Sequence, residues 1–235
     1  MEYAILFLPL IGSLIGYLGR SATKYFAEIS TSLFVSISAV LSILVFWNGI
    51  QNDSYGNYKI FEWISSGGFT ANWSIKIDPL SSIMLVVVTF VSALVHIYSI
   101  GYMSHDPHKP RFMSYLSLFT FSMLALVVSD NFLQLFFGWE GVGLCSYLLI
   151  GFWYKKETAN NAAIKAFIVN RIGDFGLAIA IFLIFFFFGT INFEETFQAT
   201  SQFTEKKIIF FGFEANLITL ILSLIHISEP TRQIV

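Results

Sequence analysis

The segment 136–154 reads FFGWEGVGLCSYLLIGFWY, and it decides the class of fold. Its residues are nearly all apolar or small, and Glu140 is its one carboxylate. A stretch of about 20 such residues matches the length of a helix that crosses the hydrocarbon core of a bilayer. The segment therefore predicts a membrane helix that carries an ionisable acid in its interior.

The composition of the whole chain agrees with this reading. Of its 235 residues, 56% are hydrophobic, 27 are Phe and only 12% are charged, whereas soluble domains carry roughly 25% charged residues. A net charge of −2 provides no basic surface for nucleic acid. The single Cys145 excludes a disulfide framework and the cysteine clusters of zinc or iron–sulfur sites. We expect an all-α integral membrane protein without a metal or cofactor site of its own.

Apolar segments divide the rest of the chain into further membrane spans. With the opening segment they make about seven transmembrane helices, at residues 3–19, 28–48, 79–102, 112–129, 131–153, 162–188 and 207–227. The loop 49–78 holds two strand-like runs, NYKIFEWI and FTANWSIKI, around the sequence SSGG. This pattern predicts a short β-hairpin that lies on one membrane face.

The distribution of Lys and Arg between the loops predicts the orientation. Loops after the first, third and fifth spans contain Arg20, Lys24, Lys109, Arg111, Lys155 and Lys156. Loops after the second, fourth and sixth spans contain Lys59, Lys76 and Lys206, and Lys207 follows at the edge of the seventh span. Because the more basic loops remain inside, the N-terminus is predicted to lie outside.

Charged residues also interrupt the sixth span, in NNAAIKAFIVNRIGDFGLAIAIF. A charge at the centre of a spanning helix costs about 2.5–3.5 kcal/mol, so these side chains should face protein or water. At a rise of about 1.5 Å per residue, Glu140, Arg171 and Asp174 fall in one middle layer of two consecutive helices. Arg171 and Asp174 share a helix face, whereas Lys165 points elsewhere and can extend to the inner boundary.

Glu140 has no cation three or four residues away on its own helix. We interpret it as a buried carboxylate that takes up and releases a proton, with a protonated, structural Glu140 as the alternative. Arg171 and Asp174 are either part of the same site or a self-neutralising packing pair. His96, in the third span, is either a proton relay or a hydrogen-bonded packing residue.

Three glycines, Gly138, Gly141 and Gly143, surround Glu140. Small residues allow neighbouring helices to approach closely. We expect these glycines to serve helix packing, with room for ordered water as the alternative.

Two runs carry a resemblance to a known family. The segment FMSYLSLFTFSMLALVVSDNFLQLFFGWEGVGLCSYLLIGFWY and the sixth span with its NRIGD sequence, together residues 112–183, resemble the antiporter-like membrane subunit of proton-pumping NADH:quinone oxidoreductase, the subunit 5 or chain L type of respiratory complex I. The preceding IDPLSSIMLVVVTFVSALVHIYSIGYM is similar to the same family. The likeness extends over residues 1–222.

The resemblance implies a function and a set of site residues. Glu140 is implied to be the acid of a proton channel, where the family pairs it with a lysine of the seventh helix, and Arg171 and Asp174 are implied to lie near the same channel. Lys165 and His96 are secondary candidates. The chain would help to translocate protons coupled to electron transport. The alternatives are the large subunit of a multi-subunit sodium/proton antiporter and a purely structural membrane-arm subunit.

The resemblance also implies where the redox chemistry lies. The chain would be an enzyme only as a subunit of the oxidoreductase, because it contains no redox motif. NAD, FMN, iron–sulfur clusters and quinone would belong to partner subunits. The expected partners are other membrane subunits, the quinone pool indirectly and the lipid bilayer. The expected location is a bacterial plasma membrane or the mitochondrial inner membrane.

The C-terminal residues depart from the family pattern. From residue 223 to 235 the sequence shows no resemblance, and SEPTRQIV reads like a frameshift, a junction or translated adaptor sequence. No lysine follows Lys207. We therefore interpret the chain as an N-terminal fragment of the family domain, residues 1–222, with an unrelated tail. Such a fragment would lack the lysine partner of Glu140 and would be inactive alone.

Overall fold

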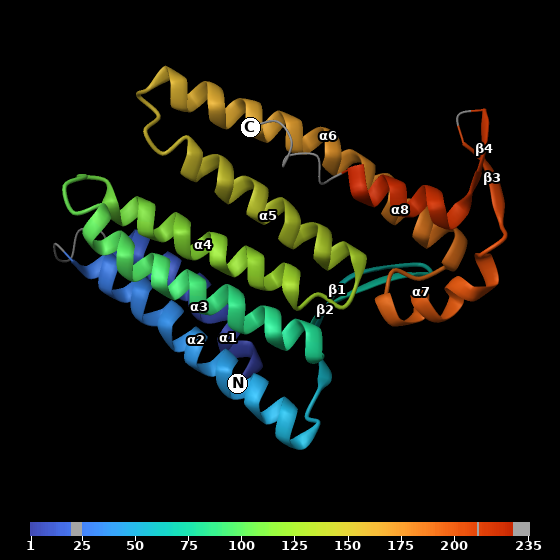
Figure 1. The fold of residues 1–235 in the computed structure, drawn as a ribbon, viewed down its shortest axis with the longest axis horizontal. Coiled ribbons are helices and arrows are strands. Elements are labelled where there is room, and N and C mark those ends of the chain that lie inside the picture. The colour runs from blue at the N-terminus through green and yellow to red at the C-terminus, as the bar shows by residue number, and fades with distance from the viewer. Residues whose placement is uncertain (20–24, 211, 228–235) are drawn as a thin grey trace.

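Helices dominate the computed structural model, which describes residues 1–19, 25–210 and 212–227 (Figure 1). Five of them are long and apolar enough to cross a membrane: α2 (Phe26–Asn52), α3 (Pro79–Tyr102), α4 (Lys109–Val127), α5 (Phe132–Ile150) and α6 (Glu157–Phe188). Two apolar helices are shorter, α1 (Glu2–Leu18) and α8 (Leu217–Ile227). The prediction of an all-α membrane fold is confirmed.

Consecutive long helices run in opposite directions and pack side by side (Figure 1). Helices α1 to α4 form one bundle, in which α1 contacts both α2 and α4, and α3 contacts both α2 and α4. Helix α5 extends this bundle, α6 packs on α5, and α8 packs on α6. Glu140 on α5 therefore lies next to the helix that carries Arg171 and Asp174, as the sequence predicted.

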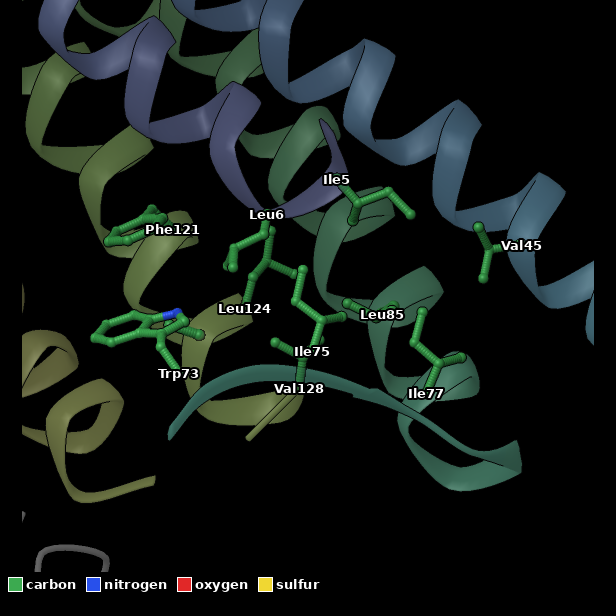
Figure 2. Packing of buried hydrophobic residues seen from close by; sticks show 11 residues of the cluster. Ile5, Leu6, Val45, Trp73, Ile75, Ile77, Leu85, Phe121, Leu124 and Val128 are labelled. Atoms are coloured by element: carbon green, nitrogen blue, oxygen red, sulfur yellow. The ribbon is translucent and has the colours of Figure 1, made fainter. Parts of the chain in front are cut away.

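The predicted hairpin is present as β1 (Gly56–Ser66) and β2 (Phe69–Ile77), which pair antiparallel. Gly67, in the two-residue connection, has φ +58°, a left-handed conformation that glycine adopts without a Cβ clash. The hairpin lies across one end of the bundle. In this position the side chains of Ala71, Trp73, Ile75 and Ile77 of β2 are buried. Figure 2 shows Ile75 and Ile77 against side chains of the helices above them.

The hairpin also defines the start of α5. The side chain of Gln134 bonds the backbone of Ser74 twice, accepting from its N–H at 3.0 Å and donating to its carbonyl at 2.7 Å. Asn131 caps α5 by accepting from Gln134 N–H at 2.9 Å, and its own amide donates to Asn72 O at 2.8 Å. These bonds satisfy helix-terminal groups that water would otherwise bind.

The loops separate into two sets at opposite ends of the bundle. The hairpin, residues 129–131 and residues 190–192 meet at one end, where Asn131 and Asn192 form a β-bridge. At the other end, Arg111 donates to Phe152 O at 3.0 Å and Trp153 donates to Asp106 at 3.0 Å. This alternation fits the predicted topology, while the side on which the N-terminus lies stays a prediction. Arg20 and Lys24 lie outside the described residues.

The last predicted span differs from the structure. Two short strands, β3 (Lys207–Phe210) and β4 (Phe213–Asn216), pair antiparallel there, and α8 then has only 11 residues. A spanning helix needs about 20 residues, so the span predicted from residue 207 was wrong in its start. Asn216 explains the late start, because its side-chain oxygen accepts from Ile218 N–H at 3.0 Å and Thr219 N–H at 3.2 Å as an N-cap.

The segment between α6 and β3 also has structure of its own. It contains the short helix α7 (Phe193–Ala199) and a 3₁₀ turn, Thr200–Phe203. Of the predicted tail, residues 223–227 continue α8, and residues 228–235 lie outside the described part of the chain.

Candidate functional site

Three charged side chains from α5 and α6 form the centre of the candidate site. Arg171 makes an ion pair with Glu140 of the neighbouring helix through Nη1 and Oε2. The same Nη1 lies 3.9 Å from Oδ2 of Asp174, one turn further along α6. The cation beside Glu140 therefore comes from the next helix, since its own helix has none three or four residues away.

Trp139 completes the cluster from the residue next to Glu140. Its indole Nε1–H donates to Asp174 Oδ1 at 2.8 Å. A buried indole N–H usually finds an acceptor, so Trp139 holds Asp174 while Arg171 holds Glu140. Sequence reasoning did not single out Trp139, although its place inside the quoted WEG sequence and its single donor were signals for it.

Exposure changes across the cluster. The Asp174 side chain is 7% exposed, Glu140 is 22% exposed and Arg171 is 47% exposed. The Arg171 guanidinium also lies 4.7 Å from the centre of the Phe167 ring, a cation–π arrangement. Asp174 is thus held between the helices, whereas Arg171 lies at the open side of α6 and has more room to move.

The glycines on α5 explain how this helix packs against α4. A Cβ on Gly138 would lie 2.6 Å from the Leu126 backbone N, and one on Gly141 would lie 2.8 Å from Ser122 Oγ. These two glycines therefore serve close packing, as predicted. Gly143 differs, because a Cβ there would meet nothing within 4 Å.

The two secondary candidates lie away from this cluster. Lys165 is exposed on α6, eight residues after Glu157 at the start of that helix. His96 is fully buried on α3, where its ring bonds Ser92 of the same helix. The structure therefore brings together Glu140, Arg171 and Asp174 but neither Lys165 nor His96.

A second buried ion pair was missed from the sequence. Lys109, at the start of α4, pairs with Glu28 near the start of α2. Their side chains are only 10% and 2% exposed, and the Lys109 ammonium also lies 4.5 Å from the centre of the Tyr25 ring. Both residues stand at the edges of predicted spans, where charges ordinarily reach water, so hydropathy alone did not mark them as buried.

The donor set of the site does not favour a metal. Within residues 1–19, 25–210 and 212–227, no group of three or more His, Cys, Asp or Glu side chains has the geometry of a metal site. A guanidinium beside the two carboxylates instead compensates one of their two negative charges.

Two family models match the chain. The N-terminal model of NADH-ubiquinone oxidoreductase (complex I) chain 5 matches residues 63–113. The transmembrane model shared by NADH:quinone oxidoreductases and Mrp antiporters matches residues 129–228. The second match includes the candidate site and extends past residue 222; the predicted boundary of the unrelated tail stays a prediction.

Curated relatives agree with these matches. NADH-ubiquinone oxidoreductase chain 5 of Chondrus crispus is 50% identical over 223 residues, covering 94% of this chain and 33% of that protein. The chain 5 protein of Triticum aestivum is 51% identical, with 97% and 34% covered. NADH-quinone oxidoreductase subunit L of Rickettsia bellii is 48% identical, with 95% and 35% covered. The chain thus spans about a third of the length of these relatives.

Solved structures share the fold. A chain of the Mrp complex from Dietzia sp. DQ12-45-1b matches with a TM-score of 0.78 at 21% identity, covering 98% of this chain and 23% of that chain. A chain of the membrane-bound sulfane sulfur reductase, an archaeal respiratory membrane complex, matches with a TM-score of 0.73 at 18% identity, with 95% and 32% covered. These structures show the shared fold alone. The sequence matches show that this chain is homologous, over most of its own length, to part of NADH-ubiquinone oxidoreductase chain 5 and NADH-quinone oxidoreductase subunit L.

Proposed function

We propose that this chain is part of a membrane subunit of NADH:quinone oxidoreductase that helps to translocate protons during electron transport. The observation that carries the proposal is the sharing of one cation, Arg171, between two carboxylates on adjacent membrane helices, Glu140 and Asp174. The relatives named as chain 5 and subunit L support the choice of complex.

Charge balance explains why this cluster would bind one proton. With both carboxylates ionised, one cation and two anions leave a net charge of −1, and a net charge inside a membrane protein is costly. One added proton makes the cluster neutral. Because the Trp139 N–H and burial already hold Asp174 in place, Glu140 is the group that exchanges the proton.

Movement of Arg171 would control that exchange. While the guanidinium contacts Glu140, it favours the ionised carboxylate; when it moves to Asp174, Glu140 loses its counter-ion and accepts a proton. The 3.9 Å separation between Nη1 and Asp174 Oδ2 makes this a short movement. In the full-length subunit, the lysine that the family places on its seventh helix would compete for Glu140 in the same way.

Electron transfer would take place in partner subunits. NAD, FMN, iron–sulfur clusters and quinone would be bound there, and the shift of charge that follows quinone reduction would reach this subunit through neighbouring membrane subunits. We place the protein in a bacterial plasma membrane or the mitochondrial inner membrane, with its N-terminus on the outer side.

The test uses the full-length subunit assembled in its complex, with Glu140→Gln as the variant. We expect NADH oxidation and assembly to persist while the protons pumped per NADH, measured with a pH-sensitive dye in inverted vesicles, fall strongly. Glu62→Gln is the matched control, because Glu62 is 49% exposed on the hairpin. Normal pumping by an assembled Glu140→Gln complex would contradict the proposal.

Two other functions give different results in the same vesicles. A sodium/proton antiporter, which the similarity to an Mrp complex favours, would exchange sodium for protons without NADH. A purely structural subunit would lose assembly rather than pumping when Glu140 is replaced.

A further inference from the structure

Buried polar atoms without partners follow one seam of the first bundle, where α2, α3 and α4 all contact one another (Figure 1). Three of these atoms have no hydrogen-bond partner among the described residues: Glu28 Oε2, Ser32 Oγ and His96 Nε2. Their residues are 1%, 7% and 0% exposed. Buried polar atoms of this kind are ordinarily bonded to ordered water. Others lie outside the seam, among them Trp73 Nε1 in the core near the hairpin.

A hydrogen bond between helices defines the relative levels of these atoms. Ser42 Oγ on α2 lies 2.7 Å from Thr89 Oγ1 on the antiparallel helix α3. Counting back from this contact at about 1.5 Å per residue, His96 lies about 10 Å from it along the axis, Ser32 about 15 Å and Glu28 about 21 Å. Along the helix axes, Glu28, Ser32 and His96 therefore follow one another at steps of about 5–6 Å. The last step, from His96 to the Ser42–Thr89 contact, is about 10 Å and passes the buried apolar cluster of Val35, Ala39 and Ala93.

Helix α4 leads to the same spacing independently. Thr120 on α4 lies 2.5 Å from Ser92 on α3. Lys109 is eleven residues before Thr120, which is about 16 Å, and His96 is about 6 Å from Ser92 in the same direction. The Lys109 end of the ion pair is thus about 10 Å from the level of His96, in agreement with the estimate from Glu28 on α2.

The hydrogen bonds of His96 define which ring nitrogen is free. The Ser92 carbonyl lies 2.8 Å from Nδ1 and can only accept, so Nδ1 carries the hydrogen. Nε2 then presents a lone pair to the seam. At the far end of the seam from Thr89, the charged groups are Glu28 from α2 and Lys109 from α4, and the titratable ring of Tyr25 lies 4.5 Å from the Lys109 ammonium.

We propose that this seam is a water-filled proton path, which begins at the Glu28–Lys109 pair and extends through Ser32 and His96 to the Ser42–Thr89 contact in the middle of the bundle. Nε2 of His96 accepts a proton from a water on the Glu28 side, which gives an imidazolium that still donates through Nδ1 to Ser92 O. Loss of the proton from Nε2 to a water on the Thr89 side restores the neutral ring. The path is separate from Glu140, but it rests on the proton-pumping function proposed for the subunit.

The first test uses the unmodified, full-length complex. A cryo-EM map at a resolution that shows ordered water should place water within hydrogen-bond distance of Glu28 Oε2, Ser32 Oγ and His96 Nε2. A dry seam would overturn the proposal, whatever the effect of Glu140→Gln on pumping.

The second test measures proton transfer in inverted vesicles of the assembled complex. Removal of a positioned proton-transfer group slows the transfer by about 100-fold, so His96→Leu should lower the protons pumped per NADH. Ser117→Ala is the matched control, because Ser117 is equally buried but donates to Pro9 O on the side of α1. Normal pumping by assembled His96→Leu complexes would overturn the role of His96. If that variant does not assemble, Ser32→Ala takes its place: normal pumping by the Ser32→Ala complex, or a seam without ordered water, would overturn the proposal.

Discussion

Two carboxylate–cation pairs connect helices of this protein, and the two pairs differ in how deeply their side chains are buried. The Glu28–Lys109 pair is 2% and 10% exposed and connects α2 to the start of α4. The Glu140–Arg171 pair is 22% and 47% exposed and has a second carboxylate, Asp174, nearby. A buried pair cannot lose one partner without leaving an uncompensated charge. A half-exposed pair with an alternative partner can rearrange at much lower cost, so the difference distinguishes a fixed contact from a movable one.

The largest expected effect comes from breaking the fixed pair. Lys109→Met leaves the buried Glu28 carboxylate without a cation and should lower the free energy of unfolding by about 3–5 kcal/mol. The full-length subunit in bicelles allows this measurement. Glu28→Gln combined with Lys109→Met removes both charges and should restore most of the loss.

An exposed pair provides the control for that experiment. Lys59 and Glu62 on β1 are 54% and 49% exposed and lie 3.8 Å apart. Lys59→Met should change the free energy of unfolding by less than about 1 kcal/mol. If Lys109→Met costs no more than Lys59→Met, the buried pair has no special role in stability.

The next effect tests how the movable pair is held. Trp139→Phe removes the hydrogen bond to Asp174 and should cost about 1.5–3 kcal/mol, because the acceptor is charged. Asp174 is then free to attract Arg171, so protons pumped per NADH should fall as well. Trp153→Phe is the matched control for Trp139→Phe, because Trp153 also donates to an aspartate, Asp106, but at an exposed loop. Equal effects of the two substitutions on pumping would contradict the role of Trp139.

A packing test shows which side of α5 is fixed. Gly138→Ala places a Cβ against the Leu126 backbone and should cost about 1–3 kcal/mol through overpacking. Gly143→Ala meets open space and should be neutral or stabilising by up to about 1 kcal/mol, because alanine favours helix. Both variants are measured in the same unfolding assay. Equal free energies of unfolding would contradict the prediction and show that α5 shifts freely against α4.

The smallest effect concerns Asp106, in the loop at the same end as the Glu28–Lys109 pair. Slight burial opposes the shift, but hydrogen bonds from Trp153 and from the His108 N–H lower the pKa of Asp106 below its usual range. A lowered pKa in the folded state stabilises the fold above the unfolded value and loses that contribution as pH falls. Asp106→Asn should therefore cost less than about 1 kcal/mol at neutral pH and nothing well below about pH 4. The measurement is the free energy of unfolding of Asp106→Asn and of the unchanged protein as a function of pH. A loss of stability that persists well below about pH 4 would show that the charge of Asp106 is not its cause.

Much of the fold follows from local patterns. The long apolar segments predicted the five long helices, and the alternating runs around SSGG predicted the hairpin β1–β2. The span from residue 207 failed because apolar residues also suit short strands, and Asn216 caps a helix that starts only at Leu217. Hydropathy averages over such a segment and does not see where the cap is.

The sequence by itself determined the membrane class, the long helices and the identity of the central charges. These depend on composition and on spacing within one helix. The sequence also predicted helix packing at three glycines, which holds for Gly138 and Gly141 but not for Gly143. Only the tertiary structure decided which side chains contact one another: Glu140 pairs with Arg171, Glu28 pairs with Lys109, and Trp139 donates a hydrogen bond to Asp174. Such pairs join residues on different helices, and their geometry depends on how whole helix faces pack, which spacing along one segment does not encode.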